Sequence, residues 1–248
     1  MVTLRSGLAV GLVAQVALLA ALATTVGLTG FGWLVGIVCG VVMVASVDRG
    51  MVRTGTDTFG PADLVTLIRA TLACAVAALV ADSFLGQAAV TALVTLAAAG
   101  LVLDAVDGWV ARRTRTTSAF GARFDGEVDA FLILVLSVYV AAEVQAWVLA
   151  IGLARYLFAA AGWIWPWMRA QLPPRYWRKV VTAVQGIALT GAAAAVLPGW
   201  LTMVALVAAA ALLAESFGRD VVWLWRRRPA GRERRASGAL VRLHLPRP

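Results

Sequence analysis

Eight mainly apolar stretches follow one another along the chain, and they constrain its fold more than any other feature. They lie at about residues 8–28, 31–47, 63–81, 88–108, 122–143, 146–168, 180–197 and 200–217. A helix of about 20 apolar residues crosses the hydrocarbon core of a bilayer. In addition, 61% of the residues are hydrophobic and only 14% are charged, which is unlike a soluble domain. We therefore predict an all-α integral membrane protein, with the first stretch retained as a helix rather than removed as a signal peptide.

The basic residues indicate how these helices are threaded through the membrane. If the N-terminus is cytoplasmic, 20 of the 22 Lys and Arg residues fall on the cytoplasmic side, and the connections on the opposite side carry none. Cytoplasmic loops of membrane proteins show this excess. We predict a multi-pass protein of the cell membrane (plasma or inner membrane) with both termini in the cytoplasm. The net charge of +9 then favours contact with anionic lipid of the bilayer, and no nucleic-acid partner is expected.

The chain divides into three segments by composition. Residues 1–62 hold two apolar helices and a cytoplasmic connection. Residues 63–218 hold six further helices, and residues 219–248 form a basic cytoplasmic tail that contains the only histidine. We expect the polar chemistry to lie in the middle segment, because the first two helices have almost no polar residues.

Four aspartates stand at the cytoplasmic ends of two neighbouring predicted helices. Asp104 and Asp107 are three residues apart, and Asp125 and Asp129 are four apart, so each pair lies on one helix face. Four uncompensated carboxylates at a membrane boundary are costly and require a cation. Oxygen ligands without His or Cys favour Mg²⁺, Mn²⁺ or Ca²⁺ over zinc, and two such ions suit phosphoryl chemistry. Glu127 faces away from these aspartates and is interpreted as a flanking residue.

Eight positions around these aspartates share the residue types and the full spacing of a known signature. They read Asp104-x2-Asp107-Gly108-x2-Ala111-Arg112-x8-Gly121-x3-Asp125-x3-Asp129. The pattern resembles the signature of the CDP-alcohol phosphotransferases. The six apolar stretches from residue 63 to residue 217 also resemble the six-helix core of that family, so the two N-terminal helices are an addition to it.

The resemblance implies an enzyme of phospholipid biosynthesis. Such enzymes transfer a phosphatidyl or related group from a CDP-alcohol, usually CDP-diacylglycerol, to an acceptor hydroxyl, and CMP leaves. All four aspartates would ligate two Mg²⁺ or Mn²⁺ ions, and Asp129 would also be the general base. The small residues and the arginine of the signature would contact the nucleotide and its diphosphate; they are Gly108, Ala111, Arg112 and Gly121. Family members are often homodimers, although no pattern here marks a dimer face.

Two further stretches resemble parts of the same family. The third apolar stretch begins like the family's Asn-x2-Thr-x2-Arg, with Thr66 and Arg69 in place and Asp63 where Asn is usual. The resemblance implies that Asp63 and Thr66 contact the nucleotide. The stretch from Lys179 to Gln185 resembles the Lys-x2-Thr-x2-Gln of phosphatidylglycerolphosphate synthase relatives. We therefore expect the nearest likeness to synthases of phosphatidylglycerolphosphate or phosphatidylinositol phosphate.

Basic residues predict the acceptor side of the site. Arg155 lies within an apolar stretch, where an arginine is costly and usually functional. It either pairs with an acid or binds a phosphate of the acceptor. Arg175, Arg178 and Lys179 lie at the cytoplasmic rim, where they either assist or simply reflect the positive-inside rule. A phosphorylated acceptor, such as glycerol 3-phosphate or inositol phosphate, suits this set.

Two other functions place charged residues inside a membrane. A transporter uses them to line a substrate path, but it needs no fixed Ala-Arg-x8-Gly spacing between acid pairs. A membrane prenyltransferase binds diphosphates through Mg²⁺ on Asp-rich helices, but its acid pairs usually lie far apart on separate repeats. The residues favour the transferase and leave its acceptor and donor open.

Overall fold

Eight long helices form almost all of the part of the chain that the computed structural model describes, which is residues 2–54, 58–86, 88–114, 119–170, 172–173 and 175–227. The helices are α1 (Leu4–Val26), α2 (Gly30–Thr54), α3 (Pro61–Ser83), α4 (Val90–Thr114), α5 (Ala119–Glu143), α6 (Leu149–Ile164), α7 (Tyr176–Ala193) and α8 (Gly199–Arg226). The short 3-10 helices η1 (Ala146–Val148) and η2 (Pro166–Arg169) flank α6. The two-residue strands β1 (Val2–Thr3) and β2 (Thr58–Phe59) form an antiparallel pair. The predicted all-α membrane fold is confirmed.

Five segments of the described chain are long and apolar enough to cross a membrane. They lie at Gly7–Val26, Gly30–Met51, Asp63–Ser83, Ala146–Ile164 and Gly199–Arg226. In α4 the apolar part is shorter and runs from Val90 to Val106. This pattern confirms a multi-pass membrane protein. The predicted spans in α4 and α5 are interrupted by acidic residues. The aspartates lie in the C-terminal half of α4 and in the N-terminal half of α5, next to the connection between the two helices.

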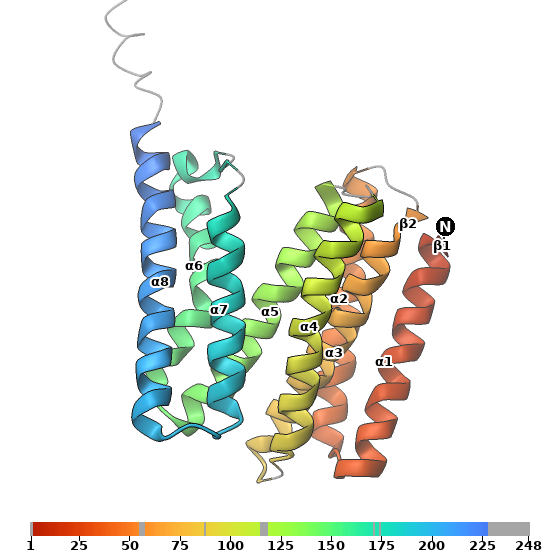
Figure 1. Ribbon diagram of the computed structural model, residues 1–248. Helices are drawn as coiled ribbons and strands as arrows, with labels where there is room; N and C mark the ends of the chain where they lie inside the picture. Colours follow the sequence, from red (N-terminus) through yellow and green to blue (C-terminus); the bar gives the residue numbers. More distant parts are fainter. Residues whose placement is uncertain are drawn as a thin grey trace, which may run out of the picture.

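Helix α3 is the centre of the larger group of helices, with α1, α2, α4 and α5 packed around it (Figure 1). Of its apolar window, 72% is buried inside the protein, compared with 22% in each of the other four candidate spans. Every side chain from Ala73 to Ala81 is buried, and five of these nine residues are alanines. Small side chains let neighbouring helices approach closely, so α3 is enclosed along its second half from Ala73 to Ala81.

The N-terminal hairpin of α1 and α2 is fastened to the end of α3 that lies away from the aspartates. The buried carboxylate of Asp82 accepts hydrogen bonds from the backbone N–H of Thr29 at 2.7 Å and from its hydroxyl at 2.6 Å. Close packing continues at Gly32, where an added Cβ would lie 2.5 Å from Asp82 Oδ1. The two additional helices therefore cover one side of α3.

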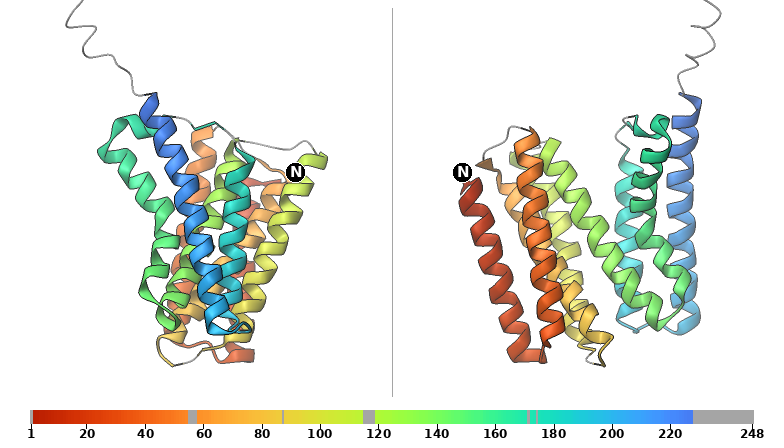
Figure 2. Two further views of the ribbon diagram at one scale, coloured as in Figure 1. Left: turned by 60° about the vertical axis from the view of Figure 1, so that its left-hand side comes forward. Right: turned by 180° about the vertical axis from the view of Figure 1, so that it is seen from behind.

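Helix α5 connects this group to a second one made of α6, α7 and α8 (Figures 1 and 2). It packs against α3 and runs obliquely to pack against α6 and α7 (Figure 1). The approach of α6 to α5 depends on Gly152, where an added Cβ would lie 2.7 Å from the Cα of Leu134. Because the connections between them are short, α3 pairs with α4 and α7 pairs with α8 as antiparallel neighbours.

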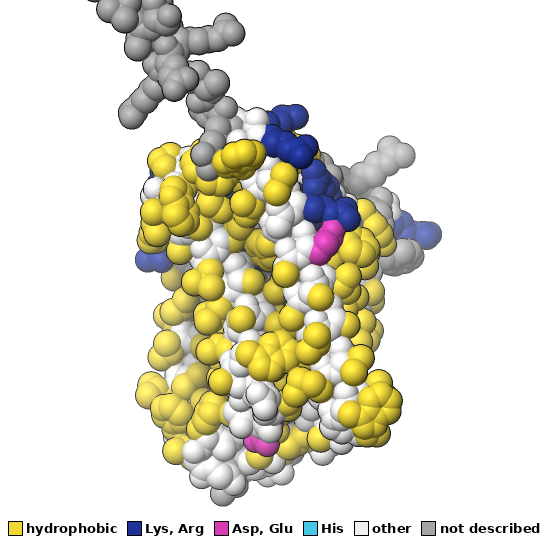
Figure 3. Space-filling model, turned by 90° about the vertical axis from the view of Figure 1, so that its left-hand side faces the viewer, with side chains coloured by type: hydrophobic (Ala, Val, Ile, Leu, Met, Phe, Trp, Pro, Cys, Tyr) yellow, Lys and Arg dark blue, Asp and Glu magenta, His cyan; other side chains and the backbone are white. Residues whose placement is uncertain are grey.

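Basic side chains gather at one end of the molecule. On the face seen in Figure 3, Lys and Arg lie near the upper end, and an acidic side chain marks the lower end. The C-terminal end of α8 lies at the basic end (Figure 1). Helix α8 continues to Arg226, so the segment predicted as a tail from residue 219 begins as helix.

Candidate metal and nucleotide site

Helices α4 and α5 bring three of the predicted aspartates together. One carboxylate oxygen each of Asp104, Asp125 and Asp129 lies within 4.8 Å of the others. Asp125 and Asp129 are one helical turn apart on α5 and therefore project from the same face. Asp104 reaches the same point from α4. The described donor set is made only of carboxylate oxygens, which suits Mg²⁺ or Mn²⁺.

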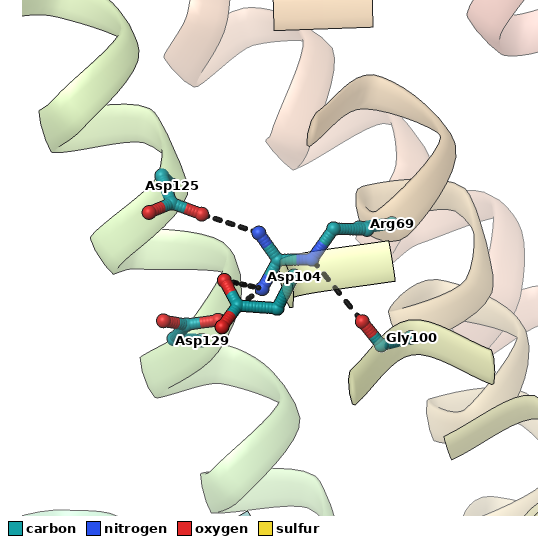
Figure 4. Close-up of polar contacts among 5 residues, drawn as sticks. All are labelled: Arg69, Gly100, Asp104, Asp125 and Asp129. Atoms are coloured by element: carbon teal, nitrogen blue, oxygen red, sulfur yellow. Dashed lines mark hydrogen bonds and ion pairs between the residues drawn. The ribbon is translucent and has the colours of Figure 1, made fainter. Parts of the chain in front are cut away.

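A buried arginine of α3 lies among these three carboxylates (Figure 4). Arg69 Nη2 lies 3.0 Å from Asp104 Oδ1, and the same guanidinium donates hydrogen bonds to Asp125 Oδ1 and Asp129 Oδ1. Its Nε donates to the carbonyl oxygen of Gly100 at 3.2 Å. The Arg69 side chain is 2% exposed, whereas those of Asp104, Asp125 and Asp129 are 39%, 26% and 20% exposed. The arginine thus lies at the buried inner side of the site, and the carboxylates lie nearer its exposed side.

Arg69 is not among the residues that the sequence predicts for the site. The sequence does mark Arg69 as a candidate functional residue, because it is the only charged residue between Asp63 and Asp82 in an apolar stretch. Its partners were not evident, because contact with Asp104 and Asp129 depends on how α3 packs between α4 and α5. Asp125 and Asp129 each turn a second oxygen away from Arg69 (Figure 4).

The other residues predicted to contact the nucleotide have different environments. Asp63 and Thr66 lie on α3 before Arg69, and both are buried. Asp63 Oδ2 accepts a hydrogen bond from the backbone N–H of Gly60 at 2.9 Å, which fixes the start of α3. An Asn side chain accepts the same bond, so the exchange of the family's Asn for Asp preserves this cap.

Five more predicted residues lie on the helices that flank the connection between α4 and α5. Gly121 is half-buried in the first turn of α5. The remaining four are placed on α4 by their backbone, but their side chains lie outside the described residues; these are Asp107, Gly108, Ala111 and Arg112.

A cavity of about 230 Å³ opens beside Asp129, between α5, α6, α7 and α8. Much of its wall is apolar, including Phe158 and Leu213, whereas Arg155 and Arg178 add charge. Gln185 lies in the wall and is buried. Its Nε2 donates to a backbone carbonyl at 2.8 Å, and its Oε1 has no hydrogen-bond partner among the described residues. Asp129 therefore belongs both to the carboxylate cluster and to the cavity.

Arg155 and Arg178, two of the basic residues predicted for the acceptor, form ion pairs with acidic residues. Arg155 Nη2 lies 2.5 Å from Glu127 Oε1, which matches the alternative that Arg155 pairs with an acid. Glu127 lies outside the three-aspartate cluster, in agreement with its interpretation as a flanking residue. Arg178 Nε lies 2.9 Å from Asp220 Oδ2 and a second nitrogen donates to the carbonyl oxygen of Pro173 at 3.0 Å.

Two of the predicted acceptor residues lie nearer the rim. Arg175 Nη1 is 3.8 Å from Asp220 Oδ1, and Lys179 is exposed. Arg155 and Arg178 thus line the cavity in pairs with carboxylates, while Arg175 and Lys179 lie close by on and before the first turn of α7.

The middle of the chain matches a family of known activity. The model of the CDP-alcohol phosphatidyltransferase family matches residues 59–213, which is more than half of the chain and runs from α3 into α8. The chain belongs to the CDP-alcohol phosphatidyltransferase family. Neither a search of curated proteins nor a search of solved structures finds a match.

Membership of the CDP-alcohol phosphatidyltransferase family shows the class of activity. The protein is a membrane enzyme that transfers a phosphatidyl group from a CDP-alcohol, and the family is typically dependent on divalent metal ions. The transporter and prenyltransferase alternatives are thereby set aside. The matched region contains Arg69 and its three aspartates, whereas α1 and α2 precede it.

Proposed function

We propose that this enzyme transfers the phosphatidyl group of CDP-diacylglycerol to the hydroxyl of a small phosphorylated alcohol at the cytoplasmic face of the cell membrane. The observation that carries the proposal is that Asp129 lies both in the carboxylate cluster and in the wall of the neighbouring cavity. One side chain thus links a place for the diphosphate to a place for the acceptor. The basic residues at this end of the molecule support the cytoplasmic orientation.

Asp104, Asp107, Asp125 and Asp129 would hold two Mg²⁺ or Mn²⁺ ions. When bound, such ions neutralise the charge that develops on the diphosphate as its bond to CMP breaks. The protein contributes the fixed positions of the carboxylates. Signature residues and the start of α3 would hold the nucleotide; this set is Asp63, Thr66, Gly108, Ala111, Arg112 and Gly121.

Asp129 would act as the general base. An acceptor hydroxyl in the cavity would lie beside Asp129, which lines the cavity wall. The hydroxyl proton passes to Asp129, and the oxygen attacks the phosphorus that carries the diacylglycerol group. The bond between that phosphorus and the oxygen of CMP breaks, and CMP leaves with the electron pair.

Arg155 and Arg178 would orient the acceptor. Both line the cavity, and each guanidinium has five N–H donors, so pairing with one carboxylate leaves donors for a phosphate. Arg175 and Lys179 would add positive charge at the rim. The unpaired Oε1 of Gln185 offers a hydrogen-bond acceptor for a second hydroxyl of the alcohol. This arrangement supports a phosphorylated polyol, as used by synthases of phosphatidylglycerolphosphate or phosphatidylinositol phosphate.

The test is CMP release by the purified protein in detergent micelles. CDP-diacylglycerol is supplied with Mg²⁺ or Mn²⁺ and with a panel of acceptors: glycerol 3-phosphate, inositol phosphate, glycerol and inositol. We expect CMP with a phosphorylated acceptor and none in EDTA. Absence of CMP with every acceptor, from protein that remains folded, would refute the proposed donor and acceptor. Turnover only with the uncharged alcohols would refute the phosphorylated acceptor and leave the transfer itself standing.

A further inference from the structure

Arg69 is a cation that bridges α4 and α5. Its guanidinium contacts one oxygen each of Asp104, Asp125 and Asp129, and these three carboxylates come from two helices. Helix α3 carries no acid that faces this point, since its own aspartates, Asp63 and Asp82, bond to Gly60 and to Thr29. One arginine of a third helix therefore holds the two acid-bearing helices together.

The arginine and the carboxylates account for one another physically. A cationic side chain that is 2% exposed in a membrane-crossing helix is costly unless it is paired. Three carboxylates within 4.8 Å of one another repel unless a cation lies between them. The planar fork of a guanidinium can donate to several carboxylates at once, whereas a lysine ammonium is a single point charge.

We infer that Arg69 is a positioning residue, a resident cation that holds the carboxylate cluster together before divalent ions bind and shares it with them afterwards. The inference rests on the proposed metal chemistry. Arg69 takes the inward oxygens, and Asp125 and Asp129 turn their second oxygens away from it, where an ion has access (Figure 4). The guanidinium and an ion would therefore neutralise the same carboxylates, and part of that neutralisation is already present before an ion binds.

This role predicts a specific link between Arg69 and metal binding. Without Arg69, the three carboxylates lose their resident cation, so a divalent ion neutralises charge that the guanidinium no longer neutralises and should bind more tightly. Because whatever binds only the folded state raises its apparent stability according to its affinity, the variant should gain more from the metal than the wild type does. A merely structural arginine would lower the melting temperature equally with and without the metal.

The experiment measures thermal unfolding of the full-length protein in detergent micelles, in EDTA and in saturating Mn²⁺. In EDTA we expect Arg69→Gln to melt about 5–10 °C below the wild type, because one partner of a buried ionic network has been removed. In Mn²⁺ we expect the difference to shrink to less than half. Arg69→Lys should fall between the two proteins, because it keeps the charge and loses the fork. The control is Arg219→Gln, which removes an arginine that pairs with Glu215 on the exposed part of α8; its small effect should be the same in both buffers.

If Arg69→Gln is not recovered folded, the double variant Arg69→Gln/Asp104→Asn tests the mutual neutralisation of Arg69 and the carboxylates directly, by recovery of folded protein in EDTA. Removing a carboxylate together with its cation should restore folded protein, and failure to do so would overturn mutual neutralisation. Equal melting of Arg69→Gln and wild type in EDTA would overturn the inference, as would an equal deficit in both buffers. In those cases Mn²⁺ still stabilises the wild type, and the proposed function stands. No effect of Mn²⁺ on the wild type would refute the proposed metal site itself.

Discussion

Replacing Gly152 by alanine should separate α6 from α5. An alanine Cβ at this position would lie 2.7 Å from the backbone Cα of Leu134 and 2.9 Å from the Ser137 hydroxyl oxygen. Ordinary contact begins at 3.4 Å, so the helices must move apart by about 0.7 Å because backbone atoms cannot rotate away. Overpacking of this kind costs about 1–3 kcal/mol. The better helix propensity of alanine offsets about 1 kcal/mol, so we expect Gly152→Ala to lose up to about 2 kcal/mol of unfolding free energy.

Moving α6 away from α5 should also change how the acceptor binds. Gly152 lines the cavity, and Arg155 lies one turn further along α6. We therefore expect a higher KM for the acceptor together with the loss of stability. Unfolding is followed in mixed micelles of a mild detergent and SDS. The matched control is Gly191→Ala on α7, where an added Cβ meets nothing within 4 Å. It should be as stable as the wild type or up to about 1 kcal/mol more stable. If Gly152→Ala is as stable as this control, the close approach of α6 to α5 is refuted.

Three other changes test the site and the N-terminal hairpin. Asp125→Asn should abolish CMP release and stabilisation by Mn²⁺ while the protein stays in the membrane, whereas Glu127→Gln should still be stabilised by Mn²⁺; turnover by Asp125→Asn would rule out its metal role. Thr29→Val should cost about 1–3 kcal/mol in the same unfolding assay, because the buried carboxylate of Asp82 loses the hydroxyl donor at 2.6 Å; wild-type stability would show that this bond does not hold the hairpin. Arg155→Gln should raise KM for a phosphorylated acceptor and leave KM for CDP-diacylglycerol unchanged, and an unchanged acceptor KM would assign Arg155 to its ion pair alone.

The helices were predictable because apolar length is a local property of the chain. The stretch expected at residues 63–81 became α3, Pro61–Ser83, which is apolar through most of its length. Predicted and observed ends differ most where a helix leaves the hydrocarbon region. The last stretch was expected to end at residue 217, yet α8 continues to Arg226, because a helix does not have to end where its side chains become charged.

The candidate site was predictable only in part. Helical spacing places Asp125 and Asp129 on one face, and that inference needs no knowledge of the neighbouring helices. The contact of Arg69 with both of them, and the pairing of Arg155 with Glu127, depend on which helices pack together and at what depth. Such contacts are set by tertiary structure, which local spacing does not encode.

The enclosure of α3 has a consequence for the order of synthesis. A chain is made from its N-terminus, so α1 and α2 precede α3, and the carboxylates of α4 and α5 follow it. When α3 enters the bilayer, the acids that will surround Arg69 have not yet been made, and an unpaired arginine in the first half of a membrane span costs at most about 2.5–3.5 kcal/mol, the value for the helix centre. Among the described helices, only the hairpin of α1 and α2 is then available to pack against α3 and to donate hydrogen bonds to Asp82. The α1–α2 hairpin is thus the first surface against which α3 can pack during synthesis.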